Sequence, residues 1–100
     1  MNEKNEYEVV HEPDESRFAV HVGDFTAVLD YQRVGDRLVL PHTGVPRELE
    51  GHGIGNLLAR EGLEWARSEN LRVVPLCPFV RAFLHRHPEY ASLTTRPEAS

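Results

Sequence analysis

The stretch Glu50-Gly51-His52-Gly53-Ile54-Gly55 marks the point at which the sequence changes its hydrophobic period. Apolar residues alternate before it and recur at helical spacing after it. The first N–H groups of a helix have no partner within the helix, and the helix dipole adds partial positive charge there. Glycines let an anion approach several of these groups together. The stretch favours a pyrophosphate site, and a tight turn without a ligand is the alternative.

The half before this stretch predicts four strands joined by tight turns. The turn signals are Gly23-Asp24 and Gly35-Asp36, two-residue pairs that are typical of hairpins between alternating segments. The strands are expected at residues 7–11, 17–22, 25–33 and 37–42. Together they predict an antiparallel meander.

The half after the stretch predicts a helix, a buried strand and a second helix. The first helix contains apolar residues at helical spacing up to Trp65 and Ala66, and Asn70 is a plausible stop. A short strand at 72–76 follows, and a helix is expected from Pro78 until His87-Pro88. A strand–helix–strand unit implies a right-handed parallel crossover. The fold class is therefore α/β (α+β) with a mixed sheet.

Size and composition predict one domain over residues 1–100, with frayed ends at 1–5 and 94–100. The formal charge of −5 argues against nucleic acid as a partner. No apolar segment predicts a membrane span or a signal peptide. We therefore expect a cytoplasmic protein. The lone Cys77 excludes a disulfide framework and a Cys-rich zinc site. His85 and His87 are two apart and do not form a metal pair, so no metal site is expected.

Two better-known phosphate motifs fit the glycine stretch poorly. Asn56 stands where the last glycine of a Rossmann fingerprint would be expected. No Lys-Ser/Thr pair follows the glycines, which excludes a Walker loop.

The stretch resembles the acetyl-CoA loop of the GNAT superfamily, Gln/Arg-x-x-Gly-x-Gly/Ala, whose two glycines fall on Gly53 and Gly55. Together with residues 42–46, 74–79 and 87–90, it resembles a short yjdJ-type GNAT subfamily of small N-acetyltransferase domain proteins. The resemblance runs from Tyr7 to Tyr90 and implies a GNAT-like mixed sheet with acetyl-CoA as co-substrate. The cofactor-binding residues that it implies are Val45, Gly51, His52, Gly53, Ile54, Gly55, Asn56, Cys77 and Phe79.

The same resemblance implies that pantetheine enters between two splayed parallel strands, those near 42–45 and 72–76, which would bring Cys77 to the thioester. Cys77 is then a nucleophile or a residue that lines the pocket, and a small buried core residue is the alternative. His42 is a candidate proton acceptor, with a strand-end histidine bonded to backbone as the alternative. Tyr90 is a candidate to protonate the leaving thiolate, or else it packs against the sheet.

Three functions remain open from the sequence. The first is an acetyl-CoA-dependent N-acetyltransferase that acts on an unidentified amine, either a small amine or a protein Lys or N-terminus. The second is a non-catalytic acyl-CoA-binding or sensing module, which Glu50 favours because it replaces the usual Gln or Arg of the loop. The third is an interaction domain with a structural glycine turn. The oligomeric state is undecided.

Overall fold

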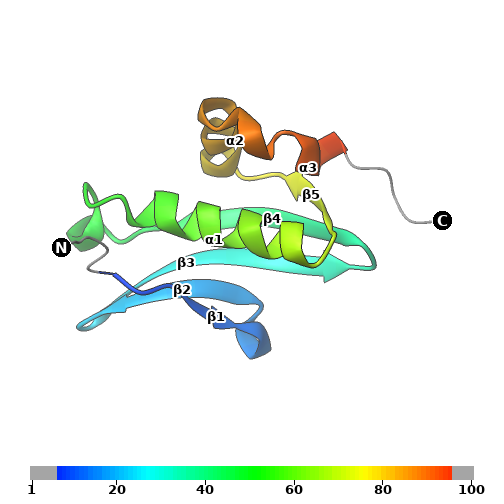
Figure 1. Ribbon diagram of the computed structural model, residues 1–100. Coiled ribbons are helices and arrows are strands. Elements are labelled where there is room, and N and C mark those ends of the chain that lie inside the picture. The colour runs from blue at the N-terminus through cyan, green and yellow to red at the C-terminus, as the bar shows by residue number, and fades with distance from the viewer. Residues whose placement is uncertain (1–6, 96–100) are drawn as a thin grey trace.

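The computed structural model describes residues 7–95 and contains one mixed sheet of five strands (Figure 1). Its order is β1-β2-β3-β4-β5, with antiparallel pairs from β1 to β4 and a parallel pair between β4 and β5. The strands are β1 (Val10–Glu12), β2 (Arg17–Val22), β3 (Phe25–Val34), β4 (Arg37–Gly44) and β5 (Arg72–Pro75). The predicted meander with an added parallel strand is therefore confirmed.

Two tight hairpins set the register of the meander. Val22 pairs with Phe25 and Val34 pairs with Arg37, so each loop has two residues, as the sequence predicts. The first residue of each loop is a glycine with positive φ, 57° at Gly23 and 61° at Gly35. The largest differences from the predicted bounds are that β1 begins at Val10 rather than at residue 7 and that β4 continues to Gly44; the ends of β1, β3 and β5 each differ by one residue.

Helices follow the sheet in the predicted order, with additional short turns. The elements are η1 (Pro13–Glu15), η2 (Arg47–Leu49), α1 (Ile54–Ser68), α2 (Pro78–Arg86), η3 (Pro88–Tyr90) and α3 (Ser92–Thr95). Asn70 adopts a left-handed conformation with φ 62° just after α1, which fits the predicted helix stop.

The sequence pattern did not indicate α3. Thr94 and Thr95, which were expected to fray, form its end. Residues 1–5 and 96–100, the other positions of that prediction, lie outside the described part of the chain.

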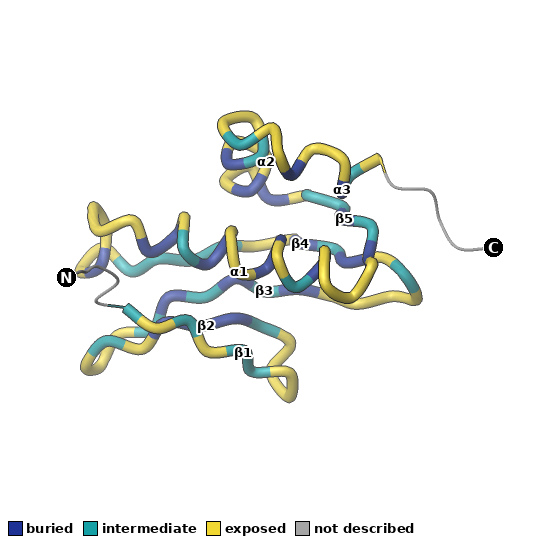
Figure 2. The backbone as a smooth tube through the Cα atoms, in the orientation of Figure 1, coloured by how far each residue is buried: buried dark blue, intermediate teal, exposed yellow. Residues whose placement is uncertain are grey.

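Helix α1 packs on the sheet and the core lies between them (Figures 1 and 2). The approach is close, because a Cβ at Gly62 would lie 2.7 Å from Cδ2 of Leu29 on β3. The C-terminal helices α2 and α3 lie beyond α1, beside β5 (Figure 1). Buried residues line the inner side of α1 and continue into α2, where Val80 and Phe83 are fully buried.

The two parallel strands separate at one end. They pair from Arg37↔Arg72 to Leu40↔Pro75, after which β4 continues to Gly44 while the chain after β5 turns into α2. The last backbone bonds across this pair run from the N–H groups of Leu76 and Cys77 to the carbonyl oxygen of Leu40, at 3.1 and 3.0 Å. Beyond Leu40 the pairing stops, and a gap lined by Thr43, Val45 and Phe79 lies between the end of β4 and the start of α2.

A bulge in β4 accompanies the gap. Asp30 pairs with His42 whereas Gln32 pairs with Val39, so β4 carries one more residue than β3 between these pairs. An extra residue bends a strand and increases its twist locally. The bulge therefore bends the last residues of β4 just where its pairing with β5 ends.

Candidate cofactor pocket and active site

A cavity of about 350 Å³ lies where the end of β4, the glycine turn and the first turns of α1 and α2 meet. Its lining contains six of the predicted cofactor residues, namely Val45, Gly51, Gly53, Gly55, Asn56 and Phe79. The rest of the lining is formed by Thr43, Leu49 and Glu50. The structure thus brings the glycine turn and the gap beside β4 into one pocket.

The glycine turn presents backbone N–H groups at the start of α1. Gly53 is the N-cap residue, and its carbonyl oxygen accepts the first helical bond, from the N–H of Leu57 at 3.1 Å. The N–H groups of Ile54, Gly55 and Asn56 precede that bond and have no acceptor within a helix. No described side chain caps the helix. These three donors, with the positive end of the helix dipole, fit an anionic group such as a pyrophosphate.

Two glycines of the turn have conformations that other residues rarely adopt. The φ angles are 85° at Gly51 and 77° at Gly53, and a Cβ at either position would meet no atom within 4 Å. Their missing side chains therefore leave open space beside the helix end. This is the geometry that a phosphate group needs to approach the backbone.

Gly55 has a different role from the one that the sequence suggested. A Cβ at Gly55 would lie 2.7 Å from Cζ of Phe79, so this glycine makes room for an aromatic ring rather than for a ligand. The ring of Phe79 lines the pocket and is 36% exposed. The other two predicted residues of the turn do not line the pocket: Ile54 is buried in the core, and the exposed His52 lies edge-on to Tyr7.

Cys77 lies just behind the pocket wall. The residue is 5% exposed, and its Sγ donates to Oγ1 of Thr43 at 3.4 Å. Thr43 lines the pocket, so the thiol adjoins the cavity through this hydroxyl. Sequence reasoning did not select Thr43 as a site residue. Its signal is a hydroxyl in the last part of β4, after the alternating apolar residues end at Leu40.

The surroundings of Cys77 favour its thiolate. Burial alone would raise the pKa of the thiol. Hydrogen bonds from the Thr43 side chain and from backbone groups of Val80, Phe79 and Thr43 outweigh burial and lower the pKa below its ordinary value. A lowered pKa makes a cysteine a better nucleophile near neutral pH.

The structure does not bring His42 to the pocket lining. Neighbouring residues of a strand point to opposite faces of the sheet, so His42 and Thr43 face opposite sides. His42 is exposed, and its ring lies against Gly44, where a Cβ would be 3.0 Å from its Nε2.

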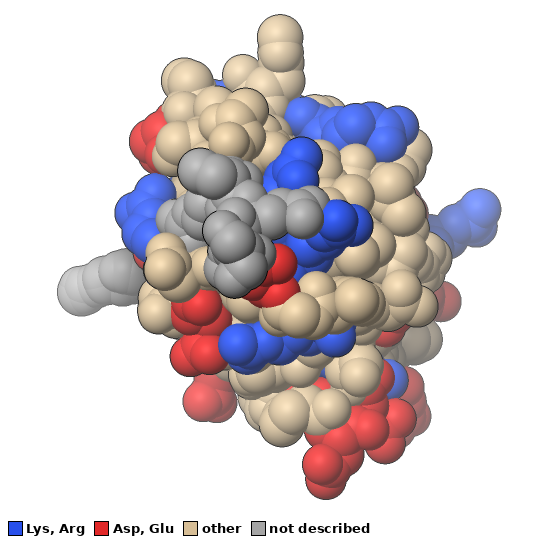
Figure 3. All heavy atoms as spheres, turned by 90° about the vertical axis from the view of Figure 1, so that its right-hand side faces the viewer, with Lys and Arg blue, Asp and Glu red and all other residues tan. Residues whose placement is uncertain are grey.

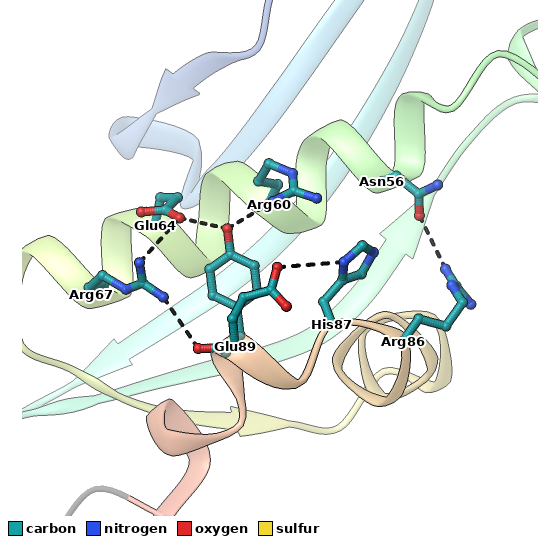
Figure 4. Close-up of polar contacts among 8 residues, drawn as sticks. Asn56, Arg60, Glu64, Arg67, Arg86, His87 and Glu89 are labelled. Carbon is teal, nitrogen blue, oxygen red and sulfur yellow. Dashed lines mark hydrogen bonds and ion pairs between the residues drawn. The ribbon is translucent and has the colours of Figure 1, made fainter.

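The structure places Tyr90 away from the pocket, in a polar network on α1. Tyr90 is 2% exposed; its hydroxyl donates to Oε2 of Glu64 at 2.6 Å and accepts from Nη1 of Arg60 at 3.1 Å (Figure 4). These partners lie one and two helical turns beyond Asn56, roughly 6 and 12 Å along the axis. Of the three catalytic candidates, only Cys77 adjoins the cavity.

Residues 17–93 match the protein family described as GCN5-related N-acetyl-transferase. The chain belongs to this family.

Its relatives are consistent with that assignment. Protein NATD1 of Mus musculus is 32% identical over 83 residues, which are 80% of this chain and 76% of the relative. Protein NATD1 of Bos taurus is 40% identical over 63 residues, and this match spans 62% of the chain but only 56% of the bovine protein. A solution NMR structure of a GCN5-like protein from Staphylococcus aureus superimposes with a TM-score of 0.68 and 28% identity, over 86% of this chain and 85% of the other.

In this GCN5-related N-acetyl-transferase domain, charge is unevenly distributed around the pocket. Glu50 is exposed and lines the cavity. Arg86, at the end of α2, donates from Nη2 to Oδ1 of Asn56 at 3.3 Å (Figure 4). Figure 3 shows the other end of the molecule, away from the glycine turn, where Lys and Arg side chains lie mostly in the upper and middle part and Asp and Glu side chains mostly below them.

Two features are absent from residues 7–95. No group of three or more His, Cys, Asp or Glu in that range is arranged to hold a metal ion. None of its helices combines the length and apolarity that crossing a membrane requires.

Proposed function

We propose that the chain is an acetyl-CoA-dependent N-acetyltransferase. The observation that carries this proposal is the junction of two features in one cavity: the uncapped, glycine-lined start of α1 and the gap between β4 and α2 beside Cys77. The first feature fits a pyrophosphate and the second fits a narrow, extended arm. In coenzyme A, a pyrophosphate is joined to the extended pantetheine arm.

The proposed binding mode follows the lining of the cavity. The pyrophosphate accepts hydrogen bonds from the N–H groups of Ile54 to Asn56, in the space left open by Gly51 and Gly53. The pantetheine arm lies between the end of β4 and the ring of Phe79. This direction brings the thioester to the side of the pocket formed by Thr43, next to the thiol of Cys77.

Acetyl-CoA supplies an activated acetyl group, and the chain supplies two routes for its transfer. In the first, the thiolate of Cys77 attacks the thioester carbonyl, a new thioester forms on Sγ, and the thiolate of coenzyme A leaves; an amine then attacks the acetyl-cysteine and releases Sγ. In the second, the amine attacks acetyl-CoA directly and Cys77 only lines the site. Because His42 and Tyr90 do not line the cavity, the ammonium loses its proton to solvent in both routes.

The acceptor that we propose is an amine, either a small molecule or a protein Lys or N-terminus in the cytoplasm. The pocket is open rather than walled on its acceptor side, because the chain from β1 to β4 consists of strands joined by tight turns and one short 3₁₀ turn. An exposed amine can therefore reach the end of β4.

The test has two parts. Calorimetry with coenzyme A measures binding, and thioester consumption with a panel of amines measures turnover. Intact mass spectrometry after brief exposure to acetyl-CoA without acceptor distinguishes the routes, because only the first leaves an acetyl group that is absent from Cys77→Ala. Lack of both binding and turnover in the wild-type protein would exclude the proposal.

A non-catalytic acyl-CoA-binding module is the second candidate. It is favoured by the position of Glu50 in the cavity and by the Tyr90 hydroxyl, which is fully engaged with Glu64 and Arg60. Tight binding of coenzyme A, no acetyl adduct and no amine acetylation would support this candidate over the enzyme.

A further inference from the structure

Three arginines lie along the boundary between α1 and the C-terminal segment, and their partners differ (Figure 4). Arg60 donates to the hydroxyl of Tyr90 at 3.1 Å. Arg67 lies 3.6 Å from a carboxylate oxygen of Glu64 and donates to a backbone carbonyl. Both belong to the network around Tyr90, on the middle and far part of α1.

Arg86 differs because its hydrogen-bond partner, Asn56, is a residue of the pocket lining. Its guanidinium donates to the side-chain amide oxygen of Asn56, and no carboxylate of residues 7–95 pairs with it. The side chain is exposed. An exposed arginine without a carboxylate keeps its charge and most of its N–H donors available for an anion.

Asn56 connects this arginine to the pocket. It is the third residue of α1 and lines the cavity together with Gly53 and Gly55. The hydrogen bond at 3.3 Å therefore holds a full positive charge at the rim of the cavity, beside the helix end that fits the pyrophosphate.

The direction of the bound ligand decides which group would meet this charge. The proposed mode places the thioester near Thr43 and Cys77 and the pyrophosphate at the start of α1. The adenosine part continues beyond the pyrophosphate, away from the thioester. Coenzyme A carries there a third phosphate, on the 3′ position of its ribose, with up to two negative charges.

We propose that Arg86, held by Asn56, binds the 3′-phosphate of coenzyme A and lets the pocket distinguish coenzyme A from dephospho-coenzyme A. This inference rests on the proposed function. Arginine suits the task because its planar guanidinium matches phosphate oxygens in pairs. Arg60 and Arg67 bond within the network around Tyr90, whereas Arg86 bonds to a residue of the pocket lining and has no carboxylate partner among residues 7–95.

A structural role for Arg86 makes a different prediction. A cation near the end of a helix interacts favourably with the helix dipole, and Arg86 is the last residue of α2. If that were its main role, replacing it would lower the melting temperature and leave the preference between the two ligands unchanged. The ratio of two affinities therefore separates the roles, because it cancels any general loss of folded protein.

The experiment is calorimetric titration of the wild type, Arg86→Gln and Arg86→Lys with coenzyme A and with dephospho-coenzyme A. We expect the wild type to prefer coenzyme A by about tenfold or more, the size of one charge-assisted hydrogen bond. Arg86→Gln should bind both ligands equally, through loss of affinity for coenzyme A alone. Arg86→Lys should retain part of the preference, because lysine keeps the charge but not the paired donors.

Arg33→Gln is the matched control. Arg33 is also an exposed arginine, but it pairs with Glu69 at 3.1 Å, at the far end of α1. The control should keep the wild-type preference.

Three results would have distinct meanings. A wild type that binds neither ligand would contradict the proposed function itself. A wild type that binds both ligands equally would overturn only the role of Arg86. Equal losses for both ligands in Arg86→Gln would also overturn it, because the contact would then be with the pyrophosphate.

Discussion

The two ends of helix α1 differ in how completely their polar groups are paired. At the C-terminal end, backbone N–H groups of Glu69 and Leu71 bond to the last carbonyl groups of the helix, and the Arg33–Glu69 pair lies beside them. At the N-terminal end, no described side chain caps the helix and two glycines leave open space.

Aromatic packing shows the same contrast. Near the C-terminal end, Trp65 lies 4.7 Å from His11 and 5.1 Å from Tyr31, ring centre to ring centre, and His11 stacks on Phe18 at 4.3 Å. At the N-terminal end the ring of Phe79 lines a cavity. The C-terminal end of α1 is packed against the rest of the fold. The N-terminal end leaves N–H donors, open space and positive charge available to a ligand.

A matched pair of valine substitutions gives the largest expected contrast. Gly53→Val should lower affinity for coenzyme A at least about thirtyfold, because it fills the open space and strains a residue with φ 77°. Gly62→Val should cost about 2 kcal/mol of stability through overpacking against Leu29, with affinity unchanged. Denaturant unfolding and calorimetry check both. Similar losses of coenzyme A affinity in the two variants would contradict the assignment of the ligand to the N-terminal end of α1.

Tyr90→Phe tests whether the network on α1 is structural. Removing the hydroxyl breaks its bonds to Glu64 and Arg60 and should lower stability by about 1 kcal/mol. Acetyl transfer should stay at the wild-type rate. A tenfold fall in turnover with intact coenzyme A binding would instead give Tyr90 a chemical role, as the sequence suggested.

Thr43→Val tests whether the Thr43 hydroxyl of the pocket lining influences the thiol of Cys77. The expected effect is smaller and is a change in how Cys77 alkylation depends on pH. Hydrogen bonds lower the pKa of Cys77, so its alkylation by iodoacetamide should increase as pH rises through that lowered pKa. The variant loses one of these bonds, so the increase should occur at higher pH. Cys77→Ala gives the background rate. An unchanged profile would show that Thr43 does not influence the thiolate.

Glu50→Gln should have the smallest effect, in the opposite direction. Glu50 lines the cavity and repels an anionic ligand, so its neutralisation should tighten coenzyme A binding by a few fold, about what an exposed charge contributes. Glu48→Gln is the control, since Glu48 is exposed on η2 but does not line the cavity. Equal changes in both variants would indicate a general charge effect rather than a local one.

The sequence predicted the fold well where local patterns determine it. Alternation and the glycine turns located the meander, and the glycine stretch marked the region in which α1 begins, at Ile54 in the structure. The short α3 was missed because it has only four residues and is held by packing against β5, which leaves no periodic signal.

The sequence indicated the part of the candidate site that the backbone of the glycine turn forms. It did not indicate the parts that depend on side chains from distant elements meeting in the fold. The glycine turn was located from the sequence, but the side-chain contacts of Thr43 with Cys77 and of Arg86 with Asn56 were not. The distances along the chain, 34 and 30 residues, explain why no local pattern shows them. Likewise, the position of Tyr90 on α1 depends on how α2 and η3 pack.

The parallel pairing of β4 with β5 has a consequence for the order of folding. Hairpins connect β2 to β4, so their contacts are close in sequence and form early, whereas β5 pairs with β4 only after residues 45–71 have crossed the sheet. Loop closure of that length makes this step slow compared with a hairpin. The gap that we assign to pantetheine exists only after this last pairing. Ligand binding during refolding should therefore lag behind the formation of the meander, and pulsed hydrogen exchange should detect the delay.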